Sequence, residues 1–194
     1  MKKDLGAQPA IFPMPVLIVA AYDKDGTVQA MNAAWGCAAG MDKVALCISE
    51  GHATTKAIRE TGAFTVALAD VAHLAEADYL GIATGNKLQD KFAKSGLSAS
   101  ESTHVHAPVI NEFPVVMECE LAEIVETEHL HMVVGTIVNA AAEESVLAED
   151  GRVDPAKAGA LTFDQFQHGY YAVGEMTGQA WNAGMDLAKA AKGA

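Results

Sequence analysis

A short polar segment near position 54 carries residue types that suit the binding of an anion. It contains His52, Thr54, Thr55 and Lys56, and helix-forming residues follow as far as Gly62. A helix N-terminus offers free backbone N–H groups and a positive dipole end, and threonine can cap it. We therefore expect a short helix that Thr54 or Thr55 caps and Gly62 ends in a left-handed conformation. Such a segment also caps many ordinary solvated helices, and these residues alone leave both roles open.

Two histidine pairs have the spacing of metal ligands. His104 and His106, like His129 and His131, would share one face of an extended segment. The first pair falls in a polar loop, and no carboxylate or cysteine is evidently grouped with either pair. We therefore expect no metal site and structural or solvent-exposed histidines, although His129 or His131 could approach an active site from a late hairpin. The cysteines form no CxxC motif and are expected to be buried, reduced thiols: Cys37, Cys47 and Cys119.

The elements that would position these residues are mostly strands. Apolar, β-branched runs predict strands over residues 16–21, 27–33, 44–49, 64–68, 115–125 and 130–140. Helical spacing is found over residues 51–62, 71–79, 88–94 and 177–191. Residues 98–108 are polar and predict a surface loop. The chain lacks a βαβ rhythm, an internal repeat and a Pro/Ser-rich linker, so we expect one domain, 1–194, built on an antiparallel barrel with helical insertions.

Composition and charge exclude several classes of partner. Of the 194 residues, 51% are hydrophobic and 20% are charged, which is typical of a folded domain. The net charge of −12 argues against nucleic acid, because phosphate backbones require clustered lysine and arginine. Lys2 and Lys3 precede an apolar stretch, but Pro13 and Pro15 interrupt it, so it predicts a first strand rather than a signal peptide or membrane span. We expect a cytoplasmic protein.

Several spaced features together resemble one known family. They follow in order from about Pro15 to Tyr171, and each is weak alone. They include Pro15-Val16, Asp25-Gly26, the segment 30–35, the segment 52–58, Gly62 to Val66, Asp78 to Gly81, Thr84-Gly85, Asp90-Lys91-Phe92, Ala107 to Ile110, and the strand 130–138 with Gly135 inside it. Their collinearity resembles the flavin reductase-like family, of the flavoredoxin kind.

The resemblance implies a mainly β fold, a six-stranded antiparallel FMN-binding split β-barrel with short helical insertions and a C-terminal helix. It implies non-covalent FMN and residues that contact it: Met31, Asn32, Ala33, Ala34, Trp35, His52, Thr54, Thr55, Lys56, Asn86, Lys91 and Phe92. The first five would let the backbone approach the flavin ring, with Trp35 as a wall or simply as core. The hydroxyls and cations near position 54 would hold the phosphate. Asn86 could equally lie in a solvated loop, and Lys91 and Phe92 could be a surface lysine and a core ring.

The activity implied is that of a flavoprotein oxidoreductase. NAD(P)H would reduce FMN as a transient co-substrate, and FMN would pass electrons to another flavin, a metal complex or oxygen. The alternative is a flavoredoxin-type electron carrier that a redox protein partner reduces. A third possibility is a barrel that binds haem or a regulatory ligand. The family also implies a homodimer with FMN near the subunit interface. No catalytic side chain is identified.

Overall fold

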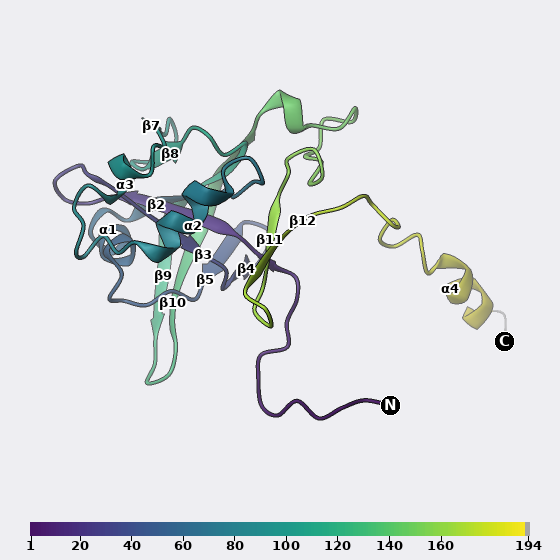
Figure 1. Cartoon of the computed structure of the whole chain (residues 1–194). Coiled ribbons are helices and arrows are strands. Elements are labelled where there is room, and N and C mark those ends of the chain that lie inside the picture. Colours follow the sequence, from purple (N-terminus) through teal and green to yellow (C-terminus); the bar gives the residue numbers. More distant parts are fainter. Residues whose placement is uncertain (193–194) are drawn as a thin grey trace.

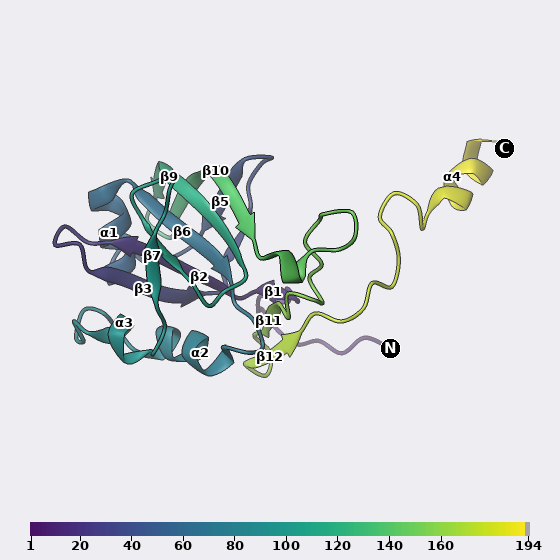
Figure 2. The ribbon, with the colours of Figure 1, turned by 90° about the horizontal axis from the view of Figure 1, so that it is seen from above.

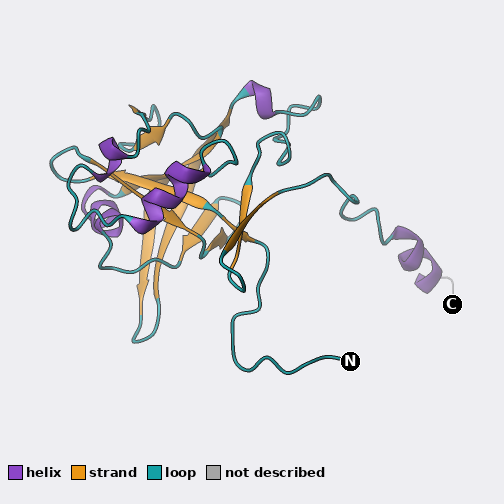
Figure 3. Ribbon diagram, viewed as in Figure 1, coloured by secondary structure: helices purple, strands orange, loops and turns teal. Residues whose placement is uncertain are grey.

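A curled antiparallel sheet forms the centre of the molecule (Figure 1, Figure 3). The structure, a computed structural model, describes residues 1–192. Seven strands make up the sheet, in the spatial order β3 (Val28–Ala33), β2 (Leu17–Tyr22), β6 (Ala63–Leu68), β9 (Val115–Glu126), β10 (His131–Ala142), β5 (Lys43–Leu46) and β4 (Gly36–Ala38). The predicted antiparallel barrel-like sheet is therefore present. It has one strand more than predicted, because the three-residue β4 is too short to give a periodic signal.

Strand β2 is buried on both faces, as its continuous apolar run predicts. Because side chains alternate across a strand, Ile18 and Ala20 enter one hydrophobic cluster and Leu17 and Val19 enter the other. The first cluster also contains residues of the helix α2 (Leu74–Ile82), and the second contains residues of the helix α1 (Ala53–Thr61). The sheet thus has a core on each side, and its two faces are both covered near β2.

Strands β9 and β10 form the long hairpin that the sequence predicts. Their register shifts between Val134 and Gly135, where β10 passes close to the core. A Cβ atom on Gly135 would lie 2.4 Å from Cζ of Phe64, a side chain with no exposed surface. The glycine therefore permits a close approach that any larger residue would disturb.

The sequence predicted the end of helix α1 (Ala53–Thr61) correctly but not its beginning. Its C-cap, Gly62, has φ of 72° and donates its N–H to the carbonyl of Ile58, as expected. Its N-cap is His52, which makes no side-chain capping bond. Thr54 and Thr55 lie inside the first turn and are buried, so the prediction that one of them caps the helix is wrong.

The other helices are short. They are α2 (Leu74–Ile82), α3 (Lys91–Lys94), the 3-10 turn η1 (Glu144–Val146) and α4 (Met185–Lys192). Helices α2 and α3 lie beside the β3 edge of the sheet (Figure 2). Helix α4 begins eight positions later than the predicted helix over 177–191. No helix in the described part of the chain is long and apolar enough to cross a membrane.

Two small sheets complete the fold, and neither was predicted. Strands β1 (Met14–Pro15), β11 (Leu161–Asp164) and β12 (Gly169–Ala172) form one sheet. Strands β7 (Ala99–Glu101) and β8 (Pro108–Ile110) form the other. Strand β7 lies within the segment 98–108 that was expected to be an irregular loop, and β8 begins at the last residue of that segment. All five strands have four residues or fewer, and such lengths leave little periodicity to detect.

Both terminal segments extend away from the sheet (Figure 1, Figure 2). We call residues 1–13 the N-terminal arm and residues 173–192 the C-terminal arm. The arms carry large exposed apolar side chains, among them Phe12 at 51% and Trp181 at 95% exposed. The two arms leave the body close together, because the Phe12 ring contacts the Tyr171 ring of β12 with centroids 5.8 Å apart.

Candidate functional site

A groove runs along β3 from the start of α1 to aromatic side chains of β11 and β12. It consists of two adjoining hollows of about 200 and about 220 Å³, which share Asn32 and Gly81. We call it the β3 groove. Its first hollow, the α1 end, is lined by Gln29 to Asn32, His52 to Thr54, Leu80 to Gly85, and Lys91. Its second hollow, the aromatic end, is lined by Asn32, Ala34, Trp35, Asp78, Gly81, Phe163 and Tyr170.

The α1 end contains a buried lysine. Lys91, at the start of α3, is only 6% exposed, and its ammonium group donates a hydrogen bond to the carbonyl of Leu80 at 2.7 Å. Burial lowers the pKa of Lys91 to about 8. Within residues 1–192, no carboxylate lies within ion-pair distance of this ammonium group. A buried cation without a counter-ion is costly, and an anionic ligand in the groove would relieve that cost.

The N-terminus of α1 opens into the same hollow. No acidic side chain occupies its first turn and no side chain caps it, so its first N–H groups are available to a ligand. Partial desolvation, with smaller contributions from Lys91 and His131, lowers the pKa of His52, so its imidazole is neutral at pH 7. A neutral imidazole can still donate one hydrogen bond to an anion. The α1 end is thus suited to a phosphate group.

Two glycines allow the loop after α2 to approach β3 and α1. A Cβ atom on Gly85 would lie 2.7 Å from Oε1 of Gln29 and 2.9 Å from Cβ of Ala53. A Cβ on Gly81 would lie 3.3 Å from Cβ of Asn32. The end of α2 and the loop after it, residues 81–85, therefore form a close wall of the groove that larger side chains would push outward.

The aromatic end has a fixed polar network behind an exposed ring. The Asn32 amide nitrogen donates to the Ala77 carbonyl at 3.0 Å and to the Tyr170 hydroxyl at 3.4 Å. The Tyr170 hydroxyl donates to Asp78 at 2.9 Å, and burial together with Asp78 raises the pKa of Tyr170 to about 12. Trp35 is 50% exposed, and its ring lies 6.4 Å from that of Phe163. Exposed and half-buried rings suit a flat aromatic ligand.

The structure brings together seven of the twelve residues that the sequence suggested for the cofactor. They line the β3 groove: Met31, Asn32, Ala34, Trp35, His52, Thr54 and Lys91. Lys56 and Asn86 lie next to it, hydrogen-bonded to each other at 3.1 Å, in a shallow hollow that also contains Asp23 and Asp25. Contact between these residues and a cofactor stays a prediction.

Three of the twelve point into the protein instead. Ala33 is 8% exposed and belongs to a core cluster, and Phe92 packs against the other cluster. Thr55 is 1% exposed, and its hydroxyl oxygen makes no hydrogen bond within the described residues. Their side chains therefore pack behind the elements that surround the groove and do not line it.

Sequence reasoning gave no role to several groove residues. Phe163 and Tyr170 were missed because the short strands β11 and β12 were not predicted. Gln29 and Asp78 were noticed only as parts of a strand and of a family-like segment. A pair of tyrosines directly after a turn at residues 165–168 is the one signal that could have indicated a further hairpin with an aromatic face.

A second hollow of about 540 Å³ lies between the loop before α1 and the β9–β10 hairpin. It is lined by residues 47–50 and 126–131, and carboxylates dominate it: Glu50, Glu126 and Glu128. Although this hollow is larger, its charge would repel a phosphate group. The β3 groove is therefore the better candidate for an anionic cofactor.

One histidine of each pair lies beside a carboxylate. His104 Nδ1 lies 2.9 Å from the buried Glu118, and His131 Nε2 lies 3.3 Å from Glu126. The inference that no carboxylate is grouped with either pair is therefore wrong. The other member of each pair is exposed: His106 and His129. The expectation of buried thiols holds for Cys119 but is wrong for Cys37 and Cys47, which are exposed.

A curled antiparallel sheet, two small additional sheets and a groove at the β3 edge are together features of a split β-barrel protein. A model of the family described as "Flavin reductase like domain" matches residues 10–166, and the chain belongs to this family. A flavoredoxin of Desulfovibrio vulgaris (Miyazaki F) superposes with a TM-score of 0.90 at 35% identity, covering 95% of this chain and 100% of that one.

Two further proteins are similar to this chain. The flavoredoxin from Methanosarcina acetivorans has a TM-score of 0.87 at 26% identity, with coverage of 96% and 99%. An uncharacterized protein of Aeropyrum pernix is 31% identical over 119 residues, which is 60% of this chain and 44% of that protein. The chain therefore matches less than half the length of this last relative. The predicted family and fold are confirmed.

Proposed function

We propose that the chain binds FMN non-covalently in the β3 groove and acts as a flavin-dependent oxidoreductase. The observation that carries this proposal is Lys91, a buried ammonium group with no carboxylate partner among the described residues, beside the open N-terminus of α1. The phosphate of FMN supplies the missing negative charge. The aromatic end, which adjoins the α1 end, suits the flat flavin ring.

The residues of the chain bind and orient the cofactor. The N–H groups of the first turn of α1, the Lys91 ammonium and the His52 imidazole hold the phosphate. Trp35 and Phe163 flank the ring, and the small side chain of Ala34 leaves room for it. The Tyr170 hydroxyl, kept neutral by its raised pKa and held by Asp78, fixes the Asn32 side chain at the middle of the groove.

The bound flavin supplies the redox chemistry, because it can accept a hydride or single electrons. NAD(P)H is the proposed reductant. It would stack on the flavin directly, since the chain has no Gly-rich dinucleotide fingerprint. The electrons would then pass to a second flavin, a metal complex or oxygen.

A specific observation favours a second candidate. The chain is 35% identical to a flavoredoxin along that protein's whole length. This supports an electron carrier that a redox protein partner reduces, with no need for NAD(P)H. The net charge of −12 suits docking to a basic partner.

We also propose a homodimer with FMN near the subunit interface, in the cytoplasm. An apolar hollow of about 350 Å³ shares Ala34 and Trp35 with the aromatic end of the groove, and residues 11 and 13–15 also line it. A second copy that covered this hollow would also cover the exposed Trp35 and exclude water from the flavin ring. The exposed thiols Cys37 and Cys47 suit a reducing compartment.

The test is the visible spectrum of the purified protein with FMN, followed by anaerobic NADH and then NADPH. Bound flavin that either nucleotide bleaches rapidly is the expected result. Bound flavin that neither bleaches would leave the electron carrier as the function. Protein that binds no flavin, or that shows the Soret band of a haem, would contradict the proposal.

A further inference from the structure

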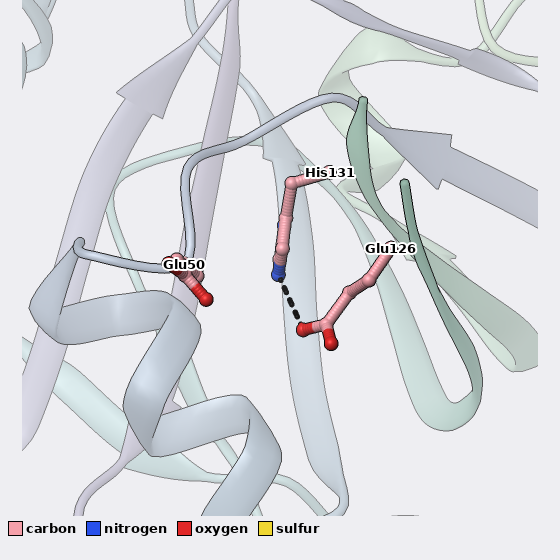
Figure 4. Close-up of side chains that lie close together, drawn as sticks. All are labelled: Glu50, Glu126 and His131. Carbon is pink, nitrogen blue, oxygen red and sulfur yellow. Dashed lines mark ion pairs between the residues drawn. The ribbon is translucent and has the colours of Figure 1, made fainter. Parts of the chain in front are cut away.

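We propose that Glu50, Glu126 and His131 form a binding site for one divalent transition-metal ion (Figure 4). One ligand atom from each residue lies within 4.8 Å of the other two. Glu50 comes from the loop before α1, Glu126 from the end of β9 and His131 from the start of β10. This site lies in the acidic hollow.

The His131 ring is oriented as metal-binding imidazoles usually are. Its Nδ1 lies 2.6 Å from the carbonyl oxygen of Ile48, which can only accept a hydrogen bond, so Nδ1 carries the proton. The other ring nitrogen, Nε2, then points toward Glu126, with Glu50 nearby (Figure 4). A backbone carbonyl that fixes the distal ring nitrogen is the usual outer partner of a metal-bound histidine.

The Nε2 atom of His131 is buried and makes no hydrogen bond among residues 1–192. Its contact with Glu126 Oε1, at 3.3 Å, has the distance of an ion pair without the geometry of a hydrogen bond. An ion bound by the second oxygen of Glu126 would give this buried nitrogen a partner.

Glu126 is held in place by Arg59, in the last turn of α1, which contacts its Oε1 atom. The carboxylate is therefore available as a ligand through its second oxygen. Glu50 is exposed and can turn toward the ion. The surrounding hollow of about 540 Å³ gives the ion a path from solvent and room for water ligands.

The ligand set defines the class of ion. One imidazole nitrogen with two carboxylates suits zinc, manganese or ferrous iron, whereas magnesium and calcium prefer oxygen alone. An ion bound here would join the tip of the β9–β10 hairpin to the loop before α1. It would therefore stabilise two segments that are far apart in the sequence.

The test uses zinc as the probe and the full chain, freed of metal by a chelator that is then removed. Isothermal titration should give one zinc ion per chain, and zinc should raise the melting temperature. His131→Gln and Glu50→Gln should each weaken zinc binding at least about tenfold, because each removes a ligand. The matched controls are His129→Gln and Glu128→Gln, which change exposed residues of the same hollow and should leave the affinity within about twofold.

Two results would overturn the proposal. One is the absence of stoichiometric zinc binding to the wild-type chain. The other is zinc binding that survives both His131→Gln and Glu50→Gln, or that the two control variants weaken equally. Binding that survives these changes but disappears in Cys47→Ser would place the ion on the nearby thiol and would overturn it as well. Because Glu50 is exposed, Glu50→Gln tests the ligand role without disturbing the fold.

Discussion

Lys91 shows how one residue can indicate a ligand. A lysine is almost never buried without a partner, because removing an ammonium group from water carries a large energetic cost. Lys91 is buried with a single carbonyl acceptor, and its pKa falls to about 8. A side chain that only filled space would be apolar. The charge therefore suits a ligand that carries the opposite charge into the β3 groove.

Replacing Lys91 by methionine keeps the volume of the side chain and removes its charge. We expect FMN affinity to fall by about 1–3 kcal/mol, the value of a charge-assisted hydrogen bond. The flavin-free protein should remain folded, since removing an unpaired buried charge is often neutral or stabilising. Fluorescence titration with FMN measures the affinity. Lys94→Met is the control, because Lys94 lies in the same helix but is exposed and paired with Asp90; equal effects in both variants would contradict the role of Lys91.

The lowered pKa of Lys91 also predicts a pH dependence. In the flavin-free protein the ammonium group loses its proton near pH 8, whereas in the unfolded chain it does so near 10.4. The unfolded state thus binds more protons between these values, and the free energy of unfolding should rise with pH across that window. FMN affinity should move in the opposite direction and fall from pH 7 to pH 9, because the phosphate favours the protonated lysine. A pH profile of FMN affinity that is the same in wild type and Lys91→Met would contradict this.

At the scale of elements, the approach of β10 to the core depends on Gly135. An alanine there would place its Cβ atom 2.4 Å from the buried Phe64 ring and 3.2 Å from Cβ of Cys119. Since that ring has no exposed surface and cannot move freely, we expect Gly135→Ala to lower the free energy of unfolding by about 1–3 kcal/mol. Urea denaturation measures this. Gly184→Ala is the control, because nothing lies within 4 Å of its added Cβ, and a Gly135→Ala protein as stable as this control would refute the packing argument.

Elements with a strong pattern were predictable from the sequence. The apolar run of β2, the turn at Asp23–Gly26, the helix ending at Gly62 and the β9–β10 hairpin all follow from local chemistry. Most strands of two to four residues were not, because their pairing partners rather than their own residues define them. The exception is β5 (Lys43–Leu46), whose apolar run was predicted. The missed strands β11 and β12 bring Phe163 and Tyr170 to the groove from more than 120 positions away along the chain from Asn32.

The same distinction applies to the candidate site. Residues on β3 and around the α1 N-terminus were found because the motif and the element coincide there. Thr55 and Phe92 were placed in the site by their neighbours in sequence, yet the turn of each helix directs them into the core. The carboxylates near His131 escaped detection because Glu50 reaches it only through tertiary structure.

At the scale of the whole molecule, the exposed apolar side chains of the two arms suggest that the arms pack against a partner. Ile11, Phe12 and Trp181 are at least half exposed, and the C-terminal arm has few contacts with the body. Exposed apolar side chains in extended segments are typical of surfaces that pack against a partner. We expect the wild-type protein to have twice the chain mass of 20.3 kDa by light scattering.

Removal of residues 174–194 should shift that equilibrium toward the monomer, because the exposed tryptophan and methionines of the C-terminal arm would no longer contact a second copy. Light scattering over a range of concentrations measures the shift, and circular dichroism checks that the sheet remains folded. A wild-type chain that is monomeric at micromolar concentration would exclude the proposed homodimer. A truncated chain that dimerises as tightly as wild type would exclude the C-terminal arm as its contact.

The most direct test of the central proposal is a parallel titration of the wild-type protein with FMN and with riboflavin, which has the same ring but no phosphate. We predict that one FMN binds per chain and that riboflavin binds at least about tenfold more weakly, because Lys91 and the α1 N-terminus bind the phosphate. Failure to bind FMN would contradict the account of the β3 groove as a flavin site. Equal affinity for the two ligands would contradict the assignment of its α1 end to the phosphate.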